Sequence, residues 1–209
     1  MKGEAHRPGV SLPGVIMAAG GSSRMGQPKQ LLRFGDVTML ELVVLAVEES
    51  TLDPIVVVVG AHADEIKAGV DLRGARAVFN ADHSRGSATS LRAGLAVVDP
   101  AAGAVIVAGD QPAITADVID ALAAEYREEN AWAAVVEYTD SVGHPWVLSH
   151  AALEAMPSHE GDKVLWDMLS GDDRVLRVAV DRPKPIDVNT WEDYDAACRD
   201  LGYLPTGAG

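Results

Sequence analysis

The sequence has a single cysteine and no hydrophobic run long enough to cross a membrane. One cysteine, Cys198, excludes an internal disulfide and any redox chemistry that needs two thiols. Its apolar position in a predicted terminal helix indicates a buried structural thiol. The apolar runs fall well short of the ~20 residues of a membrane-spanning helix. We therefore expect a cytoplasmic protein with no membrane partner.

Basic residues are scarce, because 17 lysines and arginines face 31 aspartates and glutamates, for a net charge of −14. Nucleic-acid backbones select basic surfaces, so this balance argues against a nucleic-acid partner. A chain of 209 residues, 48% of them hydrophobic, is long enough for one well-filled core. We expect a loose leader over 1–13, one domain over 14–203 and a short tail over 204–209.

Several familiar catalytic motifs are also missing. Without G-x-x-x-x-G-K-[ST] there is no Walker P-loop, and without G-x-G-x-x-G there is no dinucleotide-binding fingerprint. No G-x-S-x-G elbow suggests a serine hydrolase. The six histidines stand singly, without the close pairing of a zinc site. These common catalytic and metal-site signatures therefore do not explain the chain.

The most informative stretch that is present is the loop after Val15–Ala19. This apolar run breaks into a segment with two cations, Arg24 and Lys29, and with small residues at Gly20, Gly21, Ser22, Ser23 and Gly26. Glycines let the backbone approach a ligand, and consecutive N–H groups form an anion-binding concavity. The cations add charge where a polyphosphate would lie. The segment predicts a nucleotide site, although an ordinary turn after a strand also explains glycine and serine there.

Short β-branched runs alternate with helical patterns along the rest of the chain. We expect strands at 14–18, 54–60, 75–80, 104–108, 133–138 and 175–180, and helices at 38–50, 62–70, 87–98, 115–130 and after 190. The strands are continuous apolar runs, as expected when helices cover both faces of a sheet. The pattern predicts an α/β, doubly wound, mostly parallel sheet, with ligands at the C-terminal ends of its strands. We interpret 141–145 as a turn, and the C-terminal third as edge strands and a flap.

An acidic residue follows the strand expected at 104–108. Asp110 would lie at the C-terminal edge of the sheet, where a carboxylate beside a polyphosphate suits Mg²⁺. Asp187 and Asn189 alternate with apolar neighbours, so both point to one face and could complete the same metal site. Helix capping explains each segment equally well, since Gly-Asp is a common turn pair and Thr190 can cap a following helix.

A third polar loop lies at 78–95. Asn80 ends an expected strand, and Gly86 and Ser87 precede a helix that also carries Ser90. Amide and hydroxyl groups suit recognition of a nucleotide base, and N–H groups at a helix start can bind a ligand. N-capping of the helix by Ser87 is an equally good interpretation.

Together these segments resemble the molybdenum cofactor nucleotidyltransferases, within the MobA-like NTP transferases. MAAGGSSRMGQPKQLL is similar to their opening signature, [LM]AAG-x-S-x-RMG-x-x-K-x-L-L. Further matches follow in the family's order at Asn80/Gly86/Ser90, GDQP at 109–112, GHP at 143–145, GDK at 161–163 and DVNTWEDY at 187–194. The resemblance spans 14–201 and implies a Rossmann-like nucleotidyltransferase fold.

The resemblance implies transfer of a nucleoside monophosphate from an NTP to a phosphorylated acceptor of the molybdopterin type. By that likeness Arg24 and Lys29 hold the triphosphate and act with Asp110 in catalysis. Asp110 binds Mg²⁺, with Asp187 and Asn189 completing the site. The nucleotide-binding residues it implies are Ala18, Ala19, Gly20, Gly21, Ser22, Ser23, Arg24, Lys29, Asn80, Gly86, Ser87 and Ser90. The acceptor-binding residues are Gln111, His144, Asp162 and Lys163. The AAG form of the opening loop favours CTP, and a molybdoenzyme is the implied protein partner.

Two departures from the family's pattern bear on the acceptor and the metal. Val164, Leu165 and Trp166 follow the GDK segment, where a glycine or another small residue is usual. Asn189 stands where an aspartate is frequent, which leaves a hard-cation site one charge weaker. Two alternatives therefore stay open: an NAD(P)H-dependent oxidoreductase of the nicotine blue reductase-like branch, and a non-catalytic chaperone that holds the cofactor.

Overall fold

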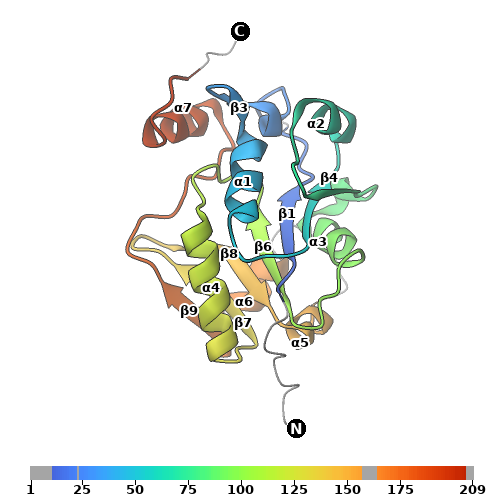
Figure 1. The fold of residues 1–209 in the computed structure, drawn as a ribbon, viewed down its shortest axis with the longest axis vertical. Coiled ribbons are helices and arrows are strands. Elements are labelled where there is room, and N and C mark those ends of the chain that lie inside the picture. Colours follow the sequence, from blue (N-terminus) through green and yellow to red (C-terminus); the bar gives the residue numbers. More distant parts are fainter. Residues whose placement is uncertain (1–10, 23, 157–163, 206–209) are drawn as a thin grey trace.

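A computed structural model describes residues 11–22, 24–156 and 164–205, and it consists of one large sheet between layers of helices (Figure 1). The sheet has seven strands in the order β5-β4-β1-β6-β8-β7-β9. Their bounds are β1 Gly14–Ala18, β4 Ile55–Val59, β5 Arg76–Phe79, β6 Ala104–Ala108, β7 Ala133–Glu137, β8 Val142–Leu148 and β9 Val175–Ala179. Only β8 runs antiparallel to its neighbours. The expected doubly wound, mostly parallel α/β sheet is confirmed.

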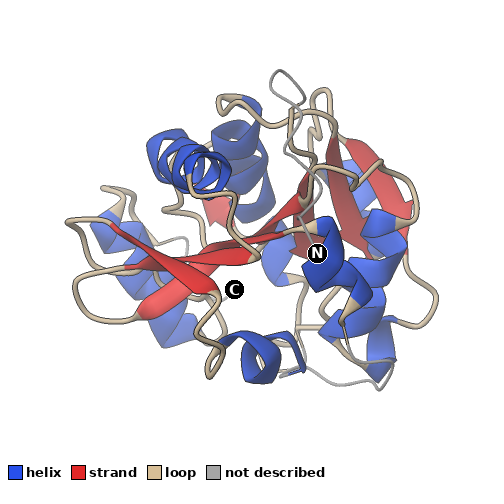
Figure 2. Cartoon of the chain, turned by 90° about the horizontal axis from the view of Figure 1, so that it is seen from below, coloured by secondary structure: helices blue, strands red, loops and turns tan. Residues whose placement is uncertain are grey.

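Helices cover both faces of the sheet, which Figure 2 shows from below. The longer helices are α1 Met39–Glu48, α3 Ser87–Leu95, α4 Ala116–Glu128 and α7 Trp191–Asp200. The shorter ones are α2 Ala63–Gly69, α5 His150–Glu154 and α6 Val164–Leu169, with 3-10 turns η1 Lys29–Leu31 and η2 His83–Arg85. Among the described residues no helix combines the length and apolar character needed to cross a membrane.

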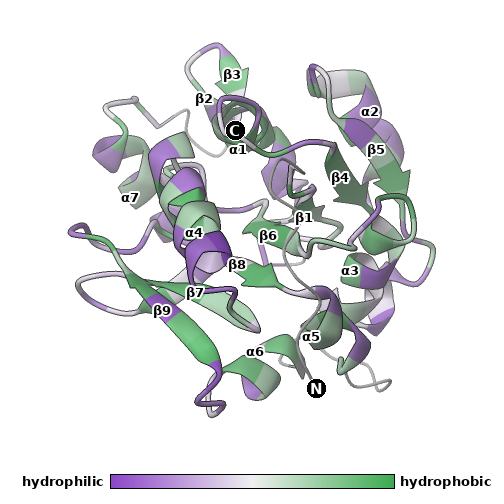
Figure 3. Ribbon diagram, turned by 60° about the horizontal axis from the view of Figure 1, so that its bottom comes forward, coloured by the Kyte–Doolittle hydropathy of each residue, from purple (hydrophilic) through white to green (hydrophobic). Residues whose placement is uncertain are grey.

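The sheet's two faces bury separate hydrophobic clusters. One cluster packs α1, α2 and α4 against residues such as Ile16 and Val107. The other packs α3, α5 and α6 against residues such as Val15 and Trp146. Figure 3 shows the hydrophobic residues along the central strands and a mixed colouring on the helices around them. Burial on both faces explains why these strands are continuous apolar runs rather than alternating ones.

A third cluster packs α7 against residues between Met25 and Leu42. It lies beside a small hairpin, β2 Arg33–Phe34 with β3 Val37–Thr38. Phe34 meets Tyr194 edge to face at 5.3 Å between ring centroids. Cys198 is fully buried here, so the prediction of a buried thiol is confirmed. Capping boxes at Thr38 and Thr190 open α1 and α7, as their sequences predict.

The interpretation of 141–145 as a turn is wrong. Residues 142–145 belong to β8, which lies inside the sheet between β6 and β7 rather than at its edge. A proline normally argues against an interior strand, because it lacks an N–H to donate. Here the register with β7 shifts between Val135 and Val136, so that His144 and Pro145 bulge out of the ladder. Of the predicted C-terminal edge strands, β9 does lie at the edge.

Candidate active site

The candidate site lies where β1 and β6 end side by side. The strand order changes direction there, because β4 and β5 lie on one side of β1 and β6 lies on the other side. Ligands of open α/β sheets usually bind at such a point. A Cβ at Gly109 would lie 2.7 Å from the Met17 carbonyl oxygen, so only glycine lets the two strand ends approach. The cavity between them measures about 190 Å³. Its lining includes Ala18, Ala19, Gly20, Lys29, Gln30, His83, Ser87, Ser90 and Asp110.

The loop after β1 is held by a buried glutamine that the sequence analysis missed. Gln30 is 2% exposed, and its Nε2 donates to the carbonyl oxygens of Ala18 at 2.9 Å and Gly20 at 3.1 Å. The Lys29 backbone N–H donates to Ser22 Oγ at 3.0 Å. These bonds fix the path of the predicted nucleotide loop. The available signal was an amide between Lys29 and the apolar pair Leu31 and Leu32.

Lys29 is the centre of the site. Its Nζ donates to Asp110 Oδ2 at 2.6 Å, to the Val188 carbonyl oxygen at 3.0 Å and to Asn189 Oδ1 at 3.0 Å. Arg24 Nη2 donates to the same Asn189 oxygen at 3.2 Å. The structure thus brings together four predicted residues that lie as far as 165 positions apart.

Asp187 belongs to a neighbouring network instead. Its Oδ1 accepts from Gln111 Nε2 at 2.7 Å, and its Oδ2 pairs with the ammonium of Lys184. Gln111 is 1% exposed, and its Oε1 has no hydrogen-bond partner among the described residues. Lys184 was also missed by the sequence analysis, because an isolated lysine in a polar loop gives no signal.

The loop at 80–90 is organised by Asn80. The buried Asn80 amide donates to Thr89 Oγ1 at 2.9 Å and to Ser90 Oγ at 3.0 Å. Asn80 Oδ1 accepts from the Asp82 N–H at 2.9 Å. The N-cap of α3 is Gly86 rather than Ser87, and its φ of 112° favours glycine. This rules out N-capping as the role of Ser87, which lines the cavity.

On the β8 side, His144 stacks on Trp146 with 3.8 Å between ring centroids and 17° between planes. Its Nδ1 lies 3.3 Å from the Ile106 carbonyl oxygen. Burial away from water lowers the pKa of His144, which favours the neutral ring. The ring centroids of Trp146 and Trp166 lie 6.2 Å apart. The rings of His144, Trp146 and Trp166 therefore form a series from the site to α6. The predicted Ser23, Asp162 and Lys163 lie outside the described residues.

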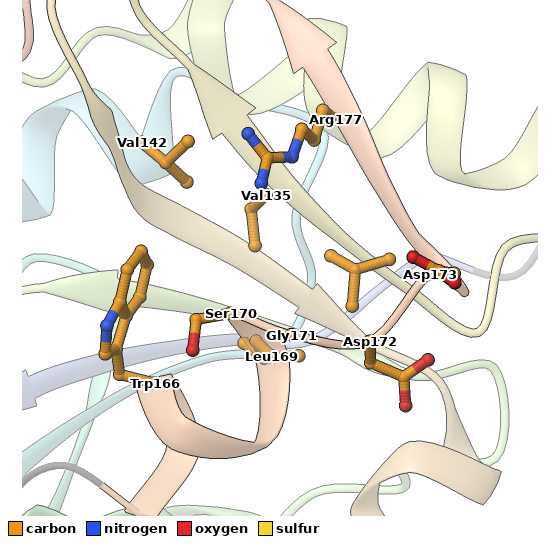
Figure 4. Close-up of a pocket in the computed structure, with 10 residues that line it drawn as sticks. Val135, Val142, Trp166, Leu169, Ser170, Gly171, Asp172, Asp173 and Arg177 are labelled. Carbon is orange, nitrogen blue, oxygen red and sulfur yellow. The ribbon is translucent and has the colours of Figure 1, made fainter.

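A second cavity of about 310 Å³ lies beyond these rings (Figure 4). It is lined by Val135, Val142, Trp166, Leu169, Ser170, Gly171, Asp172, Asp173, Val175 and Arg177. Trp166 is 39% exposed. Trp166, one of the three residues that depart from the family's pattern after the GDK segment, therefore forms a wall of this cavity.

A divalent cation would find oxygen ligands at Lys29's position. Among the residues that the structure describes, no group of three or more His, Cys, Asp or Glu side chains could hold a metal. The oxygens of Asp110, Asn189 and Val188 nevertheless converge on one point. One carboxylate with neutral oxygens fits Mg²⁺ or Mn²⁺, which usually complete their coordination with water and substrate phosphates. The donor set therefore fits such a cation.

Comparison with known proteins identifies the family. The model of the MobA-like NTP transferase domain matches residues 14–179. The chain belongs to this family. Its members are nucleotidyltransferase-type proteins, as the resemblance implied.

Individual relatives of this MobA-like chain differ in activity. The nicotine blue oxidoreductase of Paenarthrobacter nicotinovorans is 29% identical over 151 residues, covering 69% of this chain and 74% of that protein. The bifunctional protein GlmU of Staphylococcus carnosus is 33% identical over 129 residues, covering 60% of this chain. The match spans only 28% of the length of GlmU.

A solved structure gives the same fold with a metal. Rv0371c of Mycobacterium tuberculosis, in complex with manganese, has a TM-score of 0.79 and 31% sequence identity. The similarity covers 91% of this chain and 99% of that one. A homologous structure of this MobA-like fold therefore contains a divalent cation.

Proposed function

We propose that this protein is a Mg²⁺-dependent nucleotidyltransferase that moves CMP from CTP onto molybdopterin or a similar phosphorylated acceptor. One observation carries the proposal: Arg24, Lys29, Asp110 and Asn189 form a single network at the ends of β1 and β6. Two cations and a carboxylate at one point are what a triphosphate with its metal requires. Membership of an NTP transferase family supports the same reaction class.

The proposed reaction replaces one phosphoanhydride by another. An oxygen of the acceptor phosphate attacks the α-phosphorus of CTP and forms the new P–O bond. The bond from the α-phosphorus to the bridging oxygen breaks, and pyrophosphate leaves with its electron pair. An acceptor phosphate is already ionised at neutral pH, so no general base is needed. Catalysis then rests on positioning and on charge neutralisation.

The residues of the candidate site have distinct roles in this proposal. Arg24 and Lys29 neutralise the β- and γ-phosphates, and thereby the leaving pyrophosphate. The loop fixed by Gln30 presents the backbone of Ala18 to Ser22 to the nucleotide, with Ser87 and Ser90 at the cavity wall. Asp110 and Asn189 would hold the divalent cation, which neutralises charge on the phosphoryl oxygens when it is bound. Gln111 and His144 face the acceptor side.

Cytidine specificity and the molybdopterin acceptor rest on the resemblance of the AAG loop and the ordered motifs. Thermal stabilisation by CTP, GTP, ATP, NADH and NADPH, each with and without Mg²⁺, tests the nucleotide. A ligand that binds only the folded state raises the unfolding midpoint by mass action. We expect a Mg²⁺-dependent shift that is largest with CTP. A Mg²⁺-independent shift with a nicotinamide nucleotide alone would contradict the proposal.

The second candidate function is an NAD(P)H-dependent oxidoreductase. The similarity to nicotine blue oxidoreductase over 74% of that protein favours it. The cavity walled by Trp166 could accept a flat heteroaromatic substrate, because an exposed indole face favours ring stacking. The network of Arg24, Lys29 and Asp110 has no evident use in hydride transfer, so we rank this function second.

A further inference from the structure

Every donor of the Lys29 ammonium is already used. An ammonium carries three N–H groups. Asp110 Oδ2, the Val188 carbonyl oxygen and Asn189 Oδ1 accept from Nζ at 2.6, 3.0 and 3.0 Å. In this arrangement Lys29 has no donor left for a phosphate oxygen. A lysine that binds triphosphate must therefore first leave these partners.

The three acceptors form a site that suits a metal better than an ammonium. They comprise a carboxylate, an amide oxygen and a main-chain carbonyl, all hard oxygen ligands. The Val188 N–H donates to the Asp110 carbonyl oxygen at 2.9 Å, so the two segments that supply the acceptors are joined by their backbones. This backbone bond holds the three acceptors close to one another. Lys29 occupies the point on which these oxygens converge.

We propose that the Lys29 ammonium and a divalent cation occupy this three-oxygen site in turn, with the Val188 carbonyl oxygen as its third protein ligand. The inference rests on the proposed function for the trigger, because the phosphates of the nucleotide draw Lys29 away. The side chain of Lys29 is 13% exposed and lines the 190 Å³ cavity, so its flexible stem has room to turn toward a ligand there. Metal and nucleotide then bind together rather than independently.

Two other cations serve as controls for charge alone. In the described part of the chain, Arg24 donates to Asn189 Oδ1 at 3.2 Å but makes no hydrogen bond to Asp110 or Val188, and its side chain is exposed. Lys184 pairs with Asp187 in the neighbouring network. Removing either one makes the site more negative without vacating the three-oxygen position. Removing Lys29 does both.

The test is the affinity for Mn²⁺ in the absence of nucleotide, which is measured by electron paramagnetic resonance of free Mn²⁺ and by calorimetry. The proteins are wild type, Lys29→Met, Arg24→Met and Lys184→Met. If Lys29 leaves the three-oxygen site open for about one-tenth of the time, the wild-type protein binds Mn²⁺ about tenfold more weakly than a protein whose site is always open. Lys29→Met should then tighten Mn²⁺ binding by about that factor. Arg24→Met and Lys184→Met should change the affinity by less than about threefold, as expected for screened surface charges.

Further variants locate the gain and guard against misfolding. Asp110→Asn placed in the Lys29→Met background should abolish the tighter binding, because it removes the only carboxylate of the three-oxygen site. Lys29→Ala should reproduce the result of Lys29→Met, and the unfolding midpoint of each variant shows whether it is folded. Unchanged or weaker Mn²⁺ binding in both folded Lys29 variants overturns the inference. Equal gains in all three single-charge variants overturn it too, because charge alone would then suffice.

These measurements contain no nucleotide, so they separate this inference from the proposed function. If Lys29→Met binds Mn²⁺ more tightly but the wild-type protein turns over no NTP, the transferase is rejected and the shared site is kept. Turnover of CTP with no gain in Mn²⁺ affinity would reject the shared site and keep the transferase.

Discussion

The backbone N–H of Val188 donates to the carbonyl oxygen of Asp110 at 2.9 Å, which joins the segment before α7 to the end of β6. Seventy-eight positions separate the two residues in the chain, as their numbers show. This bond places the neighbouring Asn189 within reach of Lys29 and Arg24. The C-terminal segment is therefore part of the candidate site, although the family match ends at residue 179.

Asp110→Ala should abolish nucleotidyl transfer while leaving the protein folded. Loss of a carboxylate that holds a catalytic cation costs about 10²–10³-fold in kcat/KM. The Asp110 side chain is one-quarter exposed, and Lys29 keeps two other oxygen acceptors, so the variant should remain folded. Turnover assays and chemical denaturation measure the two effects. Full activity in the variant would remove Asp110 from the metal site.

Lys29→Ala should weaken the binding of CTP more than that of CMP. The proposed contact is with the β- and γ-phosphates, which CMP lacks. Calorimetric Kd values for both nucleotides, at one Mg²⁺ concentration, give the comparison. Equal losses for CTP and CMP would place Lys29 away from the terminal phosphates.

Gln30→Ala should loosen the nucleotide loop, because the Gln30 amide holds the backbone of that loop. The change leaves the carbonyl oxygens of Ala18 and Gly20 without their buried donor, which costs about 1–3 kcal/mol in the free energy of unfolding. It should also raise the KM for CTP. Gln27 is exposed, so Gln27→Ala is the matched control and should leave both quantities unchanged. Equal effects of the two substitutions would refute the role of Gln30.

His144 should make stability depend on pH in the acidic range. Burial lowers its pKa from the usual 6.5, so below that pH the unfolded chain binds a proton that the folded protein resists. The free energy of unfolding therefore falls as pH decreases from about 7 toward 5. Asp110, Asp187 and Lys184 are the charged groups near the ring, and they remain in His144→Gln. We expect a shallower slope in denaturation of this variant over that range, and an identical slope would contradict the assignment.

Trp166→Ala should raise the KM for the acceptor and leave the KM for CTP unchanged. The indole walls the second cavity and lies at the far end of the ring series from His144. Because it is 39% exposed, its loss should cost little stability. Steady-state kinetics with each substrate varied in turn separates the two constants. A selective rise in the KM for CTP would assign this cavity to the nucleotide instead.

The sequence was sufficient where local patterns decide the structure. β1 and β6, the strands that precede Gly20 and Asp110, have the expected bounds. Continuous β-branched runs are typical of strands that are buried on both faces. Pro145 led to the wrong interpretation of β8, since the bulge that tolerates it depends on the partner strand. Strand assignment failed where tertiary pairing overrides a local rule.

Predicting the site was limited in the same way. Lys29, Asp110 and Asn189 could be selected because each lies in a motif, and the structure brings them together. Asp187 was expected to share their site, but its side chain is held by Gln111 from the loop after β6 and by Lys184 three positions before it. Gln30 binds two backbone carbonyl oxygens 10 and 12 positions away, and Lys184 pairs with Asp187 three positions away. Neither contact follows from a motif in the sequence.

Transfer of label from CTP to an acceptor measures the proposed nucleotidyl transfer itself. The purified protein is incubated with Mg²⁺, molybdopterin and CTP that carries ³²P at either the α- or the γ-position, with Asp110→Ala as the control. We expect α-label in the acceptor and γ-label in pyrophosphate, and about 10²–10³-fold slower appearance of both with the variant. Binding of CTP without movement of α-label to any phosphorylated acceptor, combined with oxidation of NADPH, would contradict the account and favour the oxidoreductase.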